Sequence, residues 1–247
     1  MPTAEGRTMK IIDKLKAKNT DLFGAKAVTI AFLGDSVTQG CYECYFDENG
    51  VIQTVFDSKS AYPTRVKEIL NTLYPSAQIN IVNAGISGDN AANGNVRFER
   101  DVAPYNPDLV VVAFGLNDSC SGNDLKVYTD ALESIFAKTK AIGAECIFLF
   151  QNMMATKVSC HLKEDREKEL AKNLAEVQNG GTLDKYYSAA KETALKCGVR
   201  FCDIYSAWKK MAGGGVDVTD MLANYYNHPK REFHYYTALK VVEKMFE

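Results

Sequence analysis

The chain has 247 residues, of which 46% are hydrophobic and 24% are charged, so it is long enough to bury a core without support from disulfides or metal ions. This composition excludes a disordered, collagen-like or coiled-coil protein. The formal net charge is −2, from 29 Lys and Arg against 31 Asp and Glu, so no broad basic surface for nucleic acid or an anionic membrane is expected. We therefore expect a small-molecule substrate and neither a nucleic-acid nor a membrane partner.

The distribution of apolar residues and cysteines bears on the compartment. The first ten residues lack an apolar run that could form the core of a signal peptide, and no later run approaches the length of a membrane span. Seven cysteines, an odd number, fit reduced thiols better than a secreted disulfide framework. A cytoplasmic protein is expected. Cys41 and Cys44, the one close pair, are interpreted as two loop thiols and not as a metal or redox site.

Apolar runs rich in β-branched residues alternate with segments of helical period along the chain. The runs predict strands at 27–33, 78–83, 109–114, 146–150 and 199–202, and the periodic segments predict helices at 62–73, 124–142, 163–177, 183–196 and 235–246. This alternation is typical of right-handed βαβ units and of a parallel sheet covered by helices on both faces. We expect a disordered extension at 1–8 and a single domain at 9–247.

Residues suited to chemistry follow three of these strands. Gly34-Asp35-Ser36 follows the first predicted strand, Gly85-Ile86-Ser87-Gly88 the second, and Gly115-Leu116-Asn117 the third. In open parallel sheets the ligand site lies beyond the carboxyl ends of the strands. The sequence therefore predicts that a hydroxyl, a glycine-rich turn and a carboxamide meet at one edge of the sheet.

This set of groups supplies most of what acyl transfer needs: a hydroxyl nucleophile on a tight turn and amide donors for a developing oxyanion. A histidine base must come from elsewhere in the chain. Among the three histidines, His228 precedes a proline in a loop before the last predicted helix, whereas His234 is expected to be a surface or helix-packing residue and His161 to be solvated. His228 is the candidate base.

Four motifs, taken together and in this order, resemble the SGNH (GDSL) hydrolase superfamily of esterases, lipases and acyl hydrolases. They are GDSVTQG at 34–40, NAGISGDN at 83–90, FGLND at 114–118 and the late His228-Pro229. The resemblance implies Ser36 as the nucleophile and His228 as the base, and an oxyanion hole made by the N–H groups of Ser36 and Gly88 and the side chain of Asn117. It also implies a flavodoxin-like three-layer α/β/α sandwich with a five-stranded parallel sheet and no metal or organic cofactor.

The sequence departs from the family at one position. The family usually has an acid three residues before the histidine, whereas this chain has Tyr225 there. An acid at that place orients the imidazole and stabilises its protonated form, so another group should replace it. Asp220 is the candidate for the third catalytic residue. Asp217, Asn224 and a backbone carbonyl are the alternatives.

The sequence thus predicts a serine esterase that cleaves small O-acyl esters, acetylated sugars among them, through an acyl-enzyme intermediate. A non-catalytic protein that binds a small ligand on the same fold is the alternative, because the family's acid is missing. A flavodoxin-type nucleotide binder is disfavoured, because no phosphate-binding loop follows the first strand.

Overall fold

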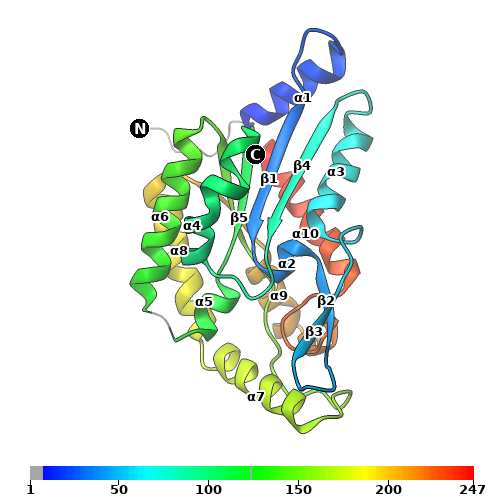
Figure 1. Ribbon diagram of the computed structural model, residues 1–247, viewed down its shortest axis with the longest axis vertical. Helices are drawn as coiled ribbons and strands as arrows, with labels where there is room; N and C mark the ends of the chain where they lie inside the picture. Colours follow the sequence, from blue (N-terminus) through cyan, green and yellow to red (C-terminus); the bar gives the residue numbers. More distant parts are fainter. Residues whose placement is uncertain (1–7, 123) are drawn as a thin grey trace.

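The computed structural model describes residues 8–122 and 124–247, so the extension expected at 1–8 lies outside the described residues except for Thr8. A five-stranded parallel sheet forms the centre of the fold (Figure 1). Its strands lie in the order β4-β1-β5-β6-β7, which is the flavodoxin-like order. They are β1 (Val28–Gly34), β4 (Ile79–Gly85), β5 (Leu109–Ala113), β6 (Glu145–Phe150) and β7 (Arg200–Asp203). The predicted sheet is confirmed, with ends shifted by one or two residues.

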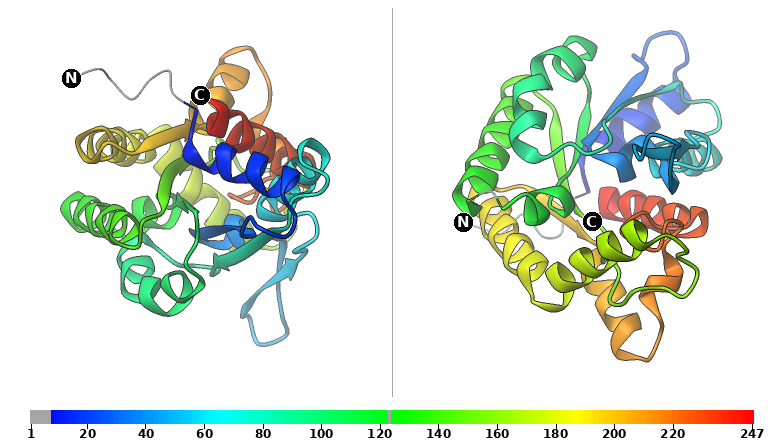
Figure 2. Two further views of the ribbon diagram at one scale, coloured as in Figure 1. Left: turned by 90° about the horizontal axis from the view of Figure 1, so that it is seen from above. Right: turned by 60° about the horizontal axis from the view of Figure 1, so that its bottom comes forward.

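Helices cover both faces of the sheet and make the three layers that were predicted (Figure 2). One layer contains α1 (Lys10–Thr20), α3 (Tyr62–Leu73) and α10 (Arg231–Phe246), and the other contains α4 (Ala91–Asp101), α6 (Leu125–Ala141) and α8 (Thr182–Cys197). All five residues of β5, at the centre, are buried, as expected for a strand covered on both faces. None of the helices in the described ranges is long and apolar enough to cross a membrane.

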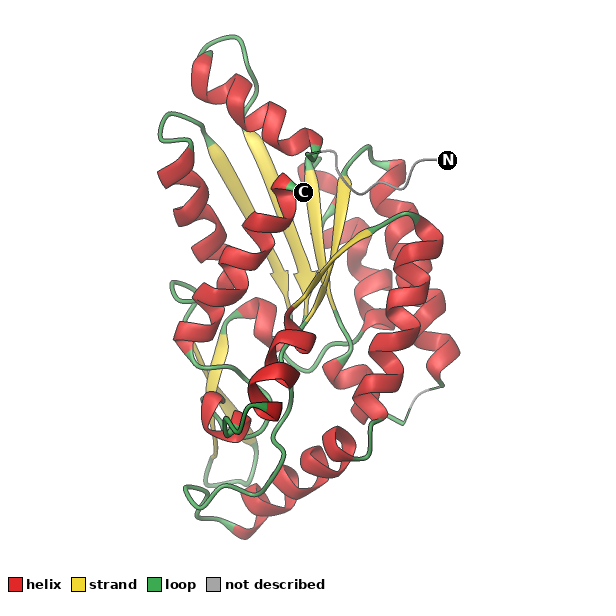
Figure 3. Cartoon of the chain, turned by 180° about the vertical axis from the view of Figure 1, so that it is seen from behind, coloured by secondary structure: helices red, strands yellow, loops and turns green. Residues whose placement is uncertain are grey.

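Shorter elements gather where the strands end (Figure 3). They are α2 (Ser36–Gln39), α5 (Leu116–Cys120), α7 (Asp165–Asn179), α9 (Ile204–Gly213) and the 3₁₀ turn Val218–Met221. The hairpin of β2 (Cys41–Phe46) and β3 (Ile52–Phe56) projects from the same end, directly after α2. This end of the sheet is the edge where the site was predicted. A second 3₁₀ turn, Ala103–Tyr105, lies before the start of β5, at the opposite end of the sheet.

The sequence did not predict the hairpin, and the interpretation of Cys41 and Cys44 as loop thiols was wrong, because both lie on β2. Their surroundings differ. Cys41 is buried, whereas Cys44 is partly exposed. The helices α1, α4 and α9 were missed as well. In α4, Gly94 and two asparagines weaken the helical signal, and the helix instead begins at an Asn90 side chain that accepts from the N–H of Asn93.

Two glycines allow α2 to approach the ends of β1 and β4. Gly34 and Gly85 are paired across these strands. A Cβ at Gly34 would lie 2.1 Å from Oγ1 of Thr38, and a Cβ at Gly85 would lie 2.3 Å from the backbone nitrogen of Gln39. Backbone atoms cannot move aside as a flexible side chain can. The position of α2 on the sheet therefore depends on the absence of a side chain at Gly85.

We expect Gly85→Ala to displace α2 and to lower the free energy of unfolding by about 1–3 kcal/mol, as overpacking against a backbone does. Urea denaturation followed by circular dichroism measures the change. Gly213→Ala is the matched control, because a Cβ at Gly213 has no atom within 4 Å. Equal midpoints for the two variants would contradict this account of the contact between α2 and the sheet.

Candidate functional site

Ser36 is the first residue of α2, and Asp35 fixes the turn that presents it. Oδ1 of Asp35 accepts hydrogen bonds from the N–H of Val37 at 3.0 Å and from the side-chain amide of Gln151 at 2.8 Å. Burial raises the pKa of Asp35 to about 7. Asp35 therefore caps the N-terminus of α2 and holds the turn that carries Ser36.

The hydroxyl of Ser36 meets the imidazole of His228. Ser36 Oγ lies 2.9 Å from Nε2 of His228, although 192 residues separate the two in sequence. Both side chains are buried, with 3% of Ser36 and 5% of His228 exposed. The predicted pairing of Ser36 with His228, and not with His234 or His161, is what the structure shows.

The loop that carries His228 is held by one asparagine. Oδ1 of Asn224 accepts hydrogen bonds from the N–H groups of Tyr226, Asn227 and His228, each at 3.0 Å. The loop also closes on itself through a hydrogen bond from the N–H of Ala223 to the carbonyl of His228 at 2.7 Å. Asn224 thus positions the backbone of the histidine, and its side chain is not the partner of the imidazole.

The second ring nitrogen of His228 faces the hairpin. Nδ1 lies 2.9 Å from the backbone carbonyl oxygen of Tyr42 and 3.7 Å from Sγ of Cys44. Because a carbonyl oxygen can only accept, Nδ1 must carry the proton and donate it. Nε2 is then left as the acceptor for the hydroxyl of Ser36. The backbone carbonyl was one of the alternatives for orienting His228, and the geometry favours it.

Asp220 and Asp217, the acids considered as partners of the His228 imidazole, make no hydrogen bond to it within the described residues. The side chain of Asp217 accepts from the N–H of Thr219 at the start of a 3₁₀ turn and pairs with Lys157. Asp220 lies inside that turn. The structure therefore does not place Asp220, the candidate third residue, on the imidazole.

The three predicted hydrogen-bond donors lie on the segments that follow the adjacent strands β1, β4 and β5. Among the described residues, the N–H groups of Ser36 and Gly88 have no acceptor, and Gly88 adopts φ 78° in a turn that faces open space. Asn117 reaches this turn, since its Nδ2 donates to the carbonyl of Asp89 at 2.8 Å. One amide hydrogen of Asn117 remains for another acceptor. The structure thus brings the three predicted donors to one edge of the sheet.

A buried arginine, which the sequence did not single out, joins the strand ends beneath this turn. Arg97 donates to the carbonyls of Gly34 and Ala84 at 2.9 and 2.7 Å, and its Nε lies 2.6 Å from a carboxylate oxygen of Asp89. The pair is buried, with 7% of the Arg97 side chain and 5% of the Asp89 side chain exposed. The arginine fixes the turn on which Gly88 lies. No signal in the sequence marks it, because two of its four partners are backbone carbonyls and the other two are the carboxylates of Asp89 and Asp101.

The other two histidines lie outside this arrangement. His234 is buried on α10, and its Nδ1 accepts from the N–H of Tyr62 at 3.1 Å, so of the two positions expected for it the structure shows the helix-packing one. Its ring lies 4.8 Å from the ring of Tyr42. His161 is exposed and stacks on Tyr225, with ring centroids 5.1 Å apart. Tyr225 therefore turns to His161 at the position where the family has its acid.

Burial governs the protonation of the candidate base. Removal from water lowers the pKa of His228 to about 4, although the hydrogen bond to Tyr42 and the charge of Glu43 act in the opposite direction. The imidazole is therefore neutral over the physiological range and free to accept a proton. Nearby, burial raises the pKa of Asp118 to about 6, and the carboxylate accepts from the N–H of Ala91.

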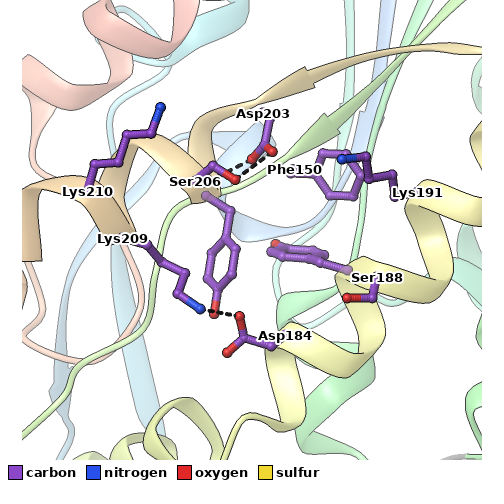
Figure 4. Close-up of a pocket in the computed structure, with 10 residues that line it drawn as sticks. Phe150, Asp184, Ser188, Lys191, Asp203, Ser206, Lys209 and Lys210 are labelled. Carbon is purple, nitrogen blue, oxygen red and sulfur yellow. Dashed lines mark hydrogen bonds and ion pairs between the residues drawn. The ribbon is translucent and has the colours of Figure 1, made fainter. Parts of the chain in front are cut away.

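A separate cavity of about 390 Å³ lies beyond β6 and β7, and Ser36 and His228 do not line it (Figure 4). Four of its polar residues form two pairs. Lys209 lies 2.5 Å from Asp184, and Asp203 accepts from the hydroxyl of Ser206 at 2.7 Å. In the described part of the chain, no group of three or more His, Cys, Asp or Glu side chains is arranged to hold a metal ion.

Comparison with known proteins identifies relatives along most of the chain. The model of the GDSL-like lipase/acylhydrolase family matches residues 32–235. An acetylxylan esterase from Geobacillus stearothermophilus is 26% identical over 192 residues, which are 74% of this chain and 78% of that protein. An arylesterase from Vibrio mimicus is 31% identical over 100 residues, which are 38% of this chain and 50% of that protein.

Solved structures share the fold. The crystal structure of an acetylxylan esterase from Geobacillus stearothermophilus has a TM-score of 0.64 at 23% identity, and the match covers 89% of this chain and 95% of that one. A two-domain esterase active on acetylated mannans has a TM-score of 0.64 at 19% identity. That match covers 96% of this chain and 51% of the other, so this chain spans about half the length of the two-domain protein.

We expect His228 to titrate with a pKa near 4, well below the ordinary value of 6.5, because the buried ring resists protonation. The Cε1 proton resonance of His228, followed by NMR from pH 3 to 8 and assigned with His228→Ala, measures this value. A midpoint between 6 and 7 would show that water reaches the ring freely.

The same titration tests the acids. Since the carbonyl of Tyr42 holds Nδ1, we expect Asp220→Asn and Asp217→Asn to leave the midpoint of His228 within about 0.3 pH units, because removal of a directly paired carboxylate would lower it by one unit or more. The two substitutions keep the size of each side chain, so they test charge alone. A fall of a full unit in either variant would restore that acid as the partner of His228.

Proposed function

This chain belongs to the GDSL-like lipase/acylhydrolase family, and we propose that it hydrolyses short O-acyl esters of carbohydrates with Ser36 as nucleophile and His228 as base. It is a carboxylic ester hydrolase. One observation carries the proposed roles. Ser36 Oγ lies 2.9 Å from a neutral His228 Nε2, beside N–H groups of Ser36 and Gly88 that have no acceptor in the described structure.

In the proposed first step, Ser36 Oγ attacks the carbonyl carbon of the ester while its proton moves to Nε2 of His228. The tetrahedral intermediate then collapses, the bond to the alcohol oxygen breaks, and the imidazolium gives its proton to the leaving alcohol. Water attacks the acyl-enzyme next, and His228 takes a proton from it. The bond between the acyl carbon and Ser36 Oγ then breaks, the imidazolium returns the proton to Oγ, and the carboxylic acid leaves. The carbonyl of Tyr42 keeps the ring in the tautomer that both steps require.

The charge that develops on the carbonyl oxygen needs donors that are already in place. We assign this role to the N–H groups of Ser36 and Gly88 and to Nδ2 of Asn117. Their positions support the assignment, because α2, the Gly88 turn and α5 all begin at the carboxyl ends of adjacent strands. Asp89 keeps Asn117 directed to the turn through its carbonyl.

Two observations support a small acyl group on a carbohydrate. Ser36 and His228 are almost entirely buried, which leaves little room for a long acyl chain. One protein of similar sequence is named acetylxylan esterase, and one protein of similar structure is active on acetylated mannans. Of the two tyrosines on β2, Tyr42 is buried against His234, whereas Tyr45 is 54% exposed and available to a sugar.

We also propose that residues 9–247 form one catalytic domain in the cytoplasm. A single core cluster, which includes residues from Met9 to Met245, supports one domain. The seven cysteines are all unpaired, which supports a reducing compartment. The number of thiols that react with a dye in the denatured, unreduced protein tests the compartment, because seven are expected and fewer would indicate disulfides.

The experiment for the function combines labelling with a substrate panel. We expect a fluorophosphonate probe to add one covalent mass to Ser36, and acetate to be released from acetylated xylooligosaccharides and from p-nitrophenyl acetate. The kcat/KM for p-nitrophenyl octanoate should be about 100-fold or more below that for the acetate, since a long chain does not fit. Mass spectrometry and product analysis give these readouts.

Ser36→Ala is the control, and it should lose the label and nearly all release of acetate. Ser87→Ala changes another serine at the same edge of the sheet and should keep both. Labelling of a different serine would refute the nucleophile. Faster cleavage of octanoate than of acetate would refute the proposed substrate class.

A further inference from the structure

Arg231, the first residue of α10, attaches the hairpin to the end of the His228 loop. Its Nη1 and Nη2 lie 2.7 and 3.2 Å from the two carboxylate oxygens of Glu43 on β2. Its Nε donates at 3.0 Å to Asp57, which follows β3. The centre of the guanidinium also lies 4.2 Å from the centroid of the Tyr42 ring. One side chain therefore contacts β2, the residue directly after β3, and the residue whose carbonyl holds His228.

The hairpin needs such an attachment at this point. Its ladder pairs Cys41 with Phe56 and Cys44 with Thr54, so the register shifts between the two pairs and Tyr42 and Glu43 lie in a bulge. Bulged residues are not fixed by regular ladder hydrogen bonds, and they redirect the chain. The carbonyl that orients the imidazole thus belongs to the part of the hairpin that its own ladder constrains least.

The ring of Tyr42 cannot fix the bulge by a hydrogen bond. Its hydroxyl is buried and has no partner among the described residues. The ring instead contacts the imidazole of His234, 4.8 Å away, and the guanidinium of Arg231. Arg231 therefore contributes both the stacking contact on Tyr42 and the paired hydrogen bonds on Glu43, its neighbour in the chain.

We propose that Arg231 and Glu43 are positioning residues for the esterase, and that their ion pair fixes the bulge so that the carbonyl of Tyr42 faces Nδ1 of His228. This inference rests on the proposed function. An acid side chain could follow the imidazole by rotating, but a backbone carbonyl is useful only when its own chain is immobile. The two-point contact of a guanidinium with a carboxylate supplies a defined geometry.

The ion pair should affect catalysis more than stability. The side chains of Arg231 and Glu43 are 37% and 46% exposed, and pairs at such positions contribute little to the free energy of unfolding. A merely structural role would change stability and leave kcat of the folded enzyme intact. A positioning role lowers kcat, leaves KM nearly unchanged and disturbs the hydrogen bond at Nδ1.

The test measures kcat and KM on p-nitrophenyl acetate, together with the downfield NMR resonance of the His228 Nδ1 proton. For Arg231→Ala we expect a kcat about 10- to 100-fold lower, a KM within about twofold of wild type, and a shifted or broadened resonance. Glu43→Gln, which keeps the size of the side chain, should change both readouts in the same direction. Arg231→Lys keeps the charge without the two parallel hydrogen bonds and should give an intermediate kcat.

Arg166→Ala is the matched control. Its guanidinium lies 4.5 Å from the ring of Phe46 at the far end of the same hairpin, where it has no contact with Tyr42. We expect wild-type kcat and an unchanged resonance in this variant. An equal loss of kcat in Arg166→Ala and Arg231→Ala would overturn the inference, because it would show a general need for an ordered hairpin.

Wild-type kcat and an unchanged resonance in Arg231→Ala would also overturn it. If Arg231→Ala does not fold, Glu43→Gln decides the matter by the same two readouts. Failure of the proposed function looks different, because wild-type protein would then neither cleave esters nor react with the fluorophosphonate. The resonance would still report whether Arg231 holds the hydrogen bond.

Discussion

The hydrogen bond between Nδ1 of His228 and the carbonyl of Tyr42 joins two parts of the chain that are 186 residues apart, and the geometry of Ser36 depends on it. A carbonyl has a fixed direction and no charge that could attract the ring from a distance. Both partners must therefore be held independently. Asn224 holds the backbone of the His228 loop through three N–H groups, and the hairpin that begins directly after α2 presents Tyr42.

The ionisable groups near Ser36 are also held mostly in uncharged or paired forms. Burial lowers the pKa of His228 to about 4 and raises the pKa of Asp35 to about 7, so burial favours the uncharged form of each group. Asp89, which is buried as well, is paired with Arg97. Arg97 offsets the charge of Asp89, and burial favours the uncharged form of Asp35, so both effects reduce the repulsion of a negative charge that develops near Gly88. This edge of the sheet is thus suited to a neutral ester that becomes an anion only during the reaction.

The sheet could be predicted from sequence because each of its strands is a short apolar run. The site could be predicted because its residues follow three of those strands. Ser36, Gly88 and Asn117 come from adjacent strand ends, and His228 was recognised by the proline after it. The partner of His228 could not be identified, because every residue has a carbonyl and nothing in the side chain of Tyr42 marks it. The hairpin was missed for a related reason: a bulge and mixed polarity obscure its alternation.

The absence of an acid before His228 and the presence of the hairpin carbonyl are parts of one arrangement. Tyr225 has φ 60°, a conformation imposed where the loop turns so that the Asn224 side chain can accept from three following N–H groups, and its ring stacks on His161. The single proton on Nδ1 is already donated to Tyr42 at 2.9 Å. A carboxylate directed at Nδ1 would lie against the carbonyl oxygen of Tyr42, and the two oxygen atoms would repel each other. It would also have no hydrogen bond to accept, because the only proton on Nδ1 is already donated to Tyr42. An acid at residue 225 would therefore require the hairpin to withdraw, and with the hairpin in place a tyrosine that points away is compatible with the site.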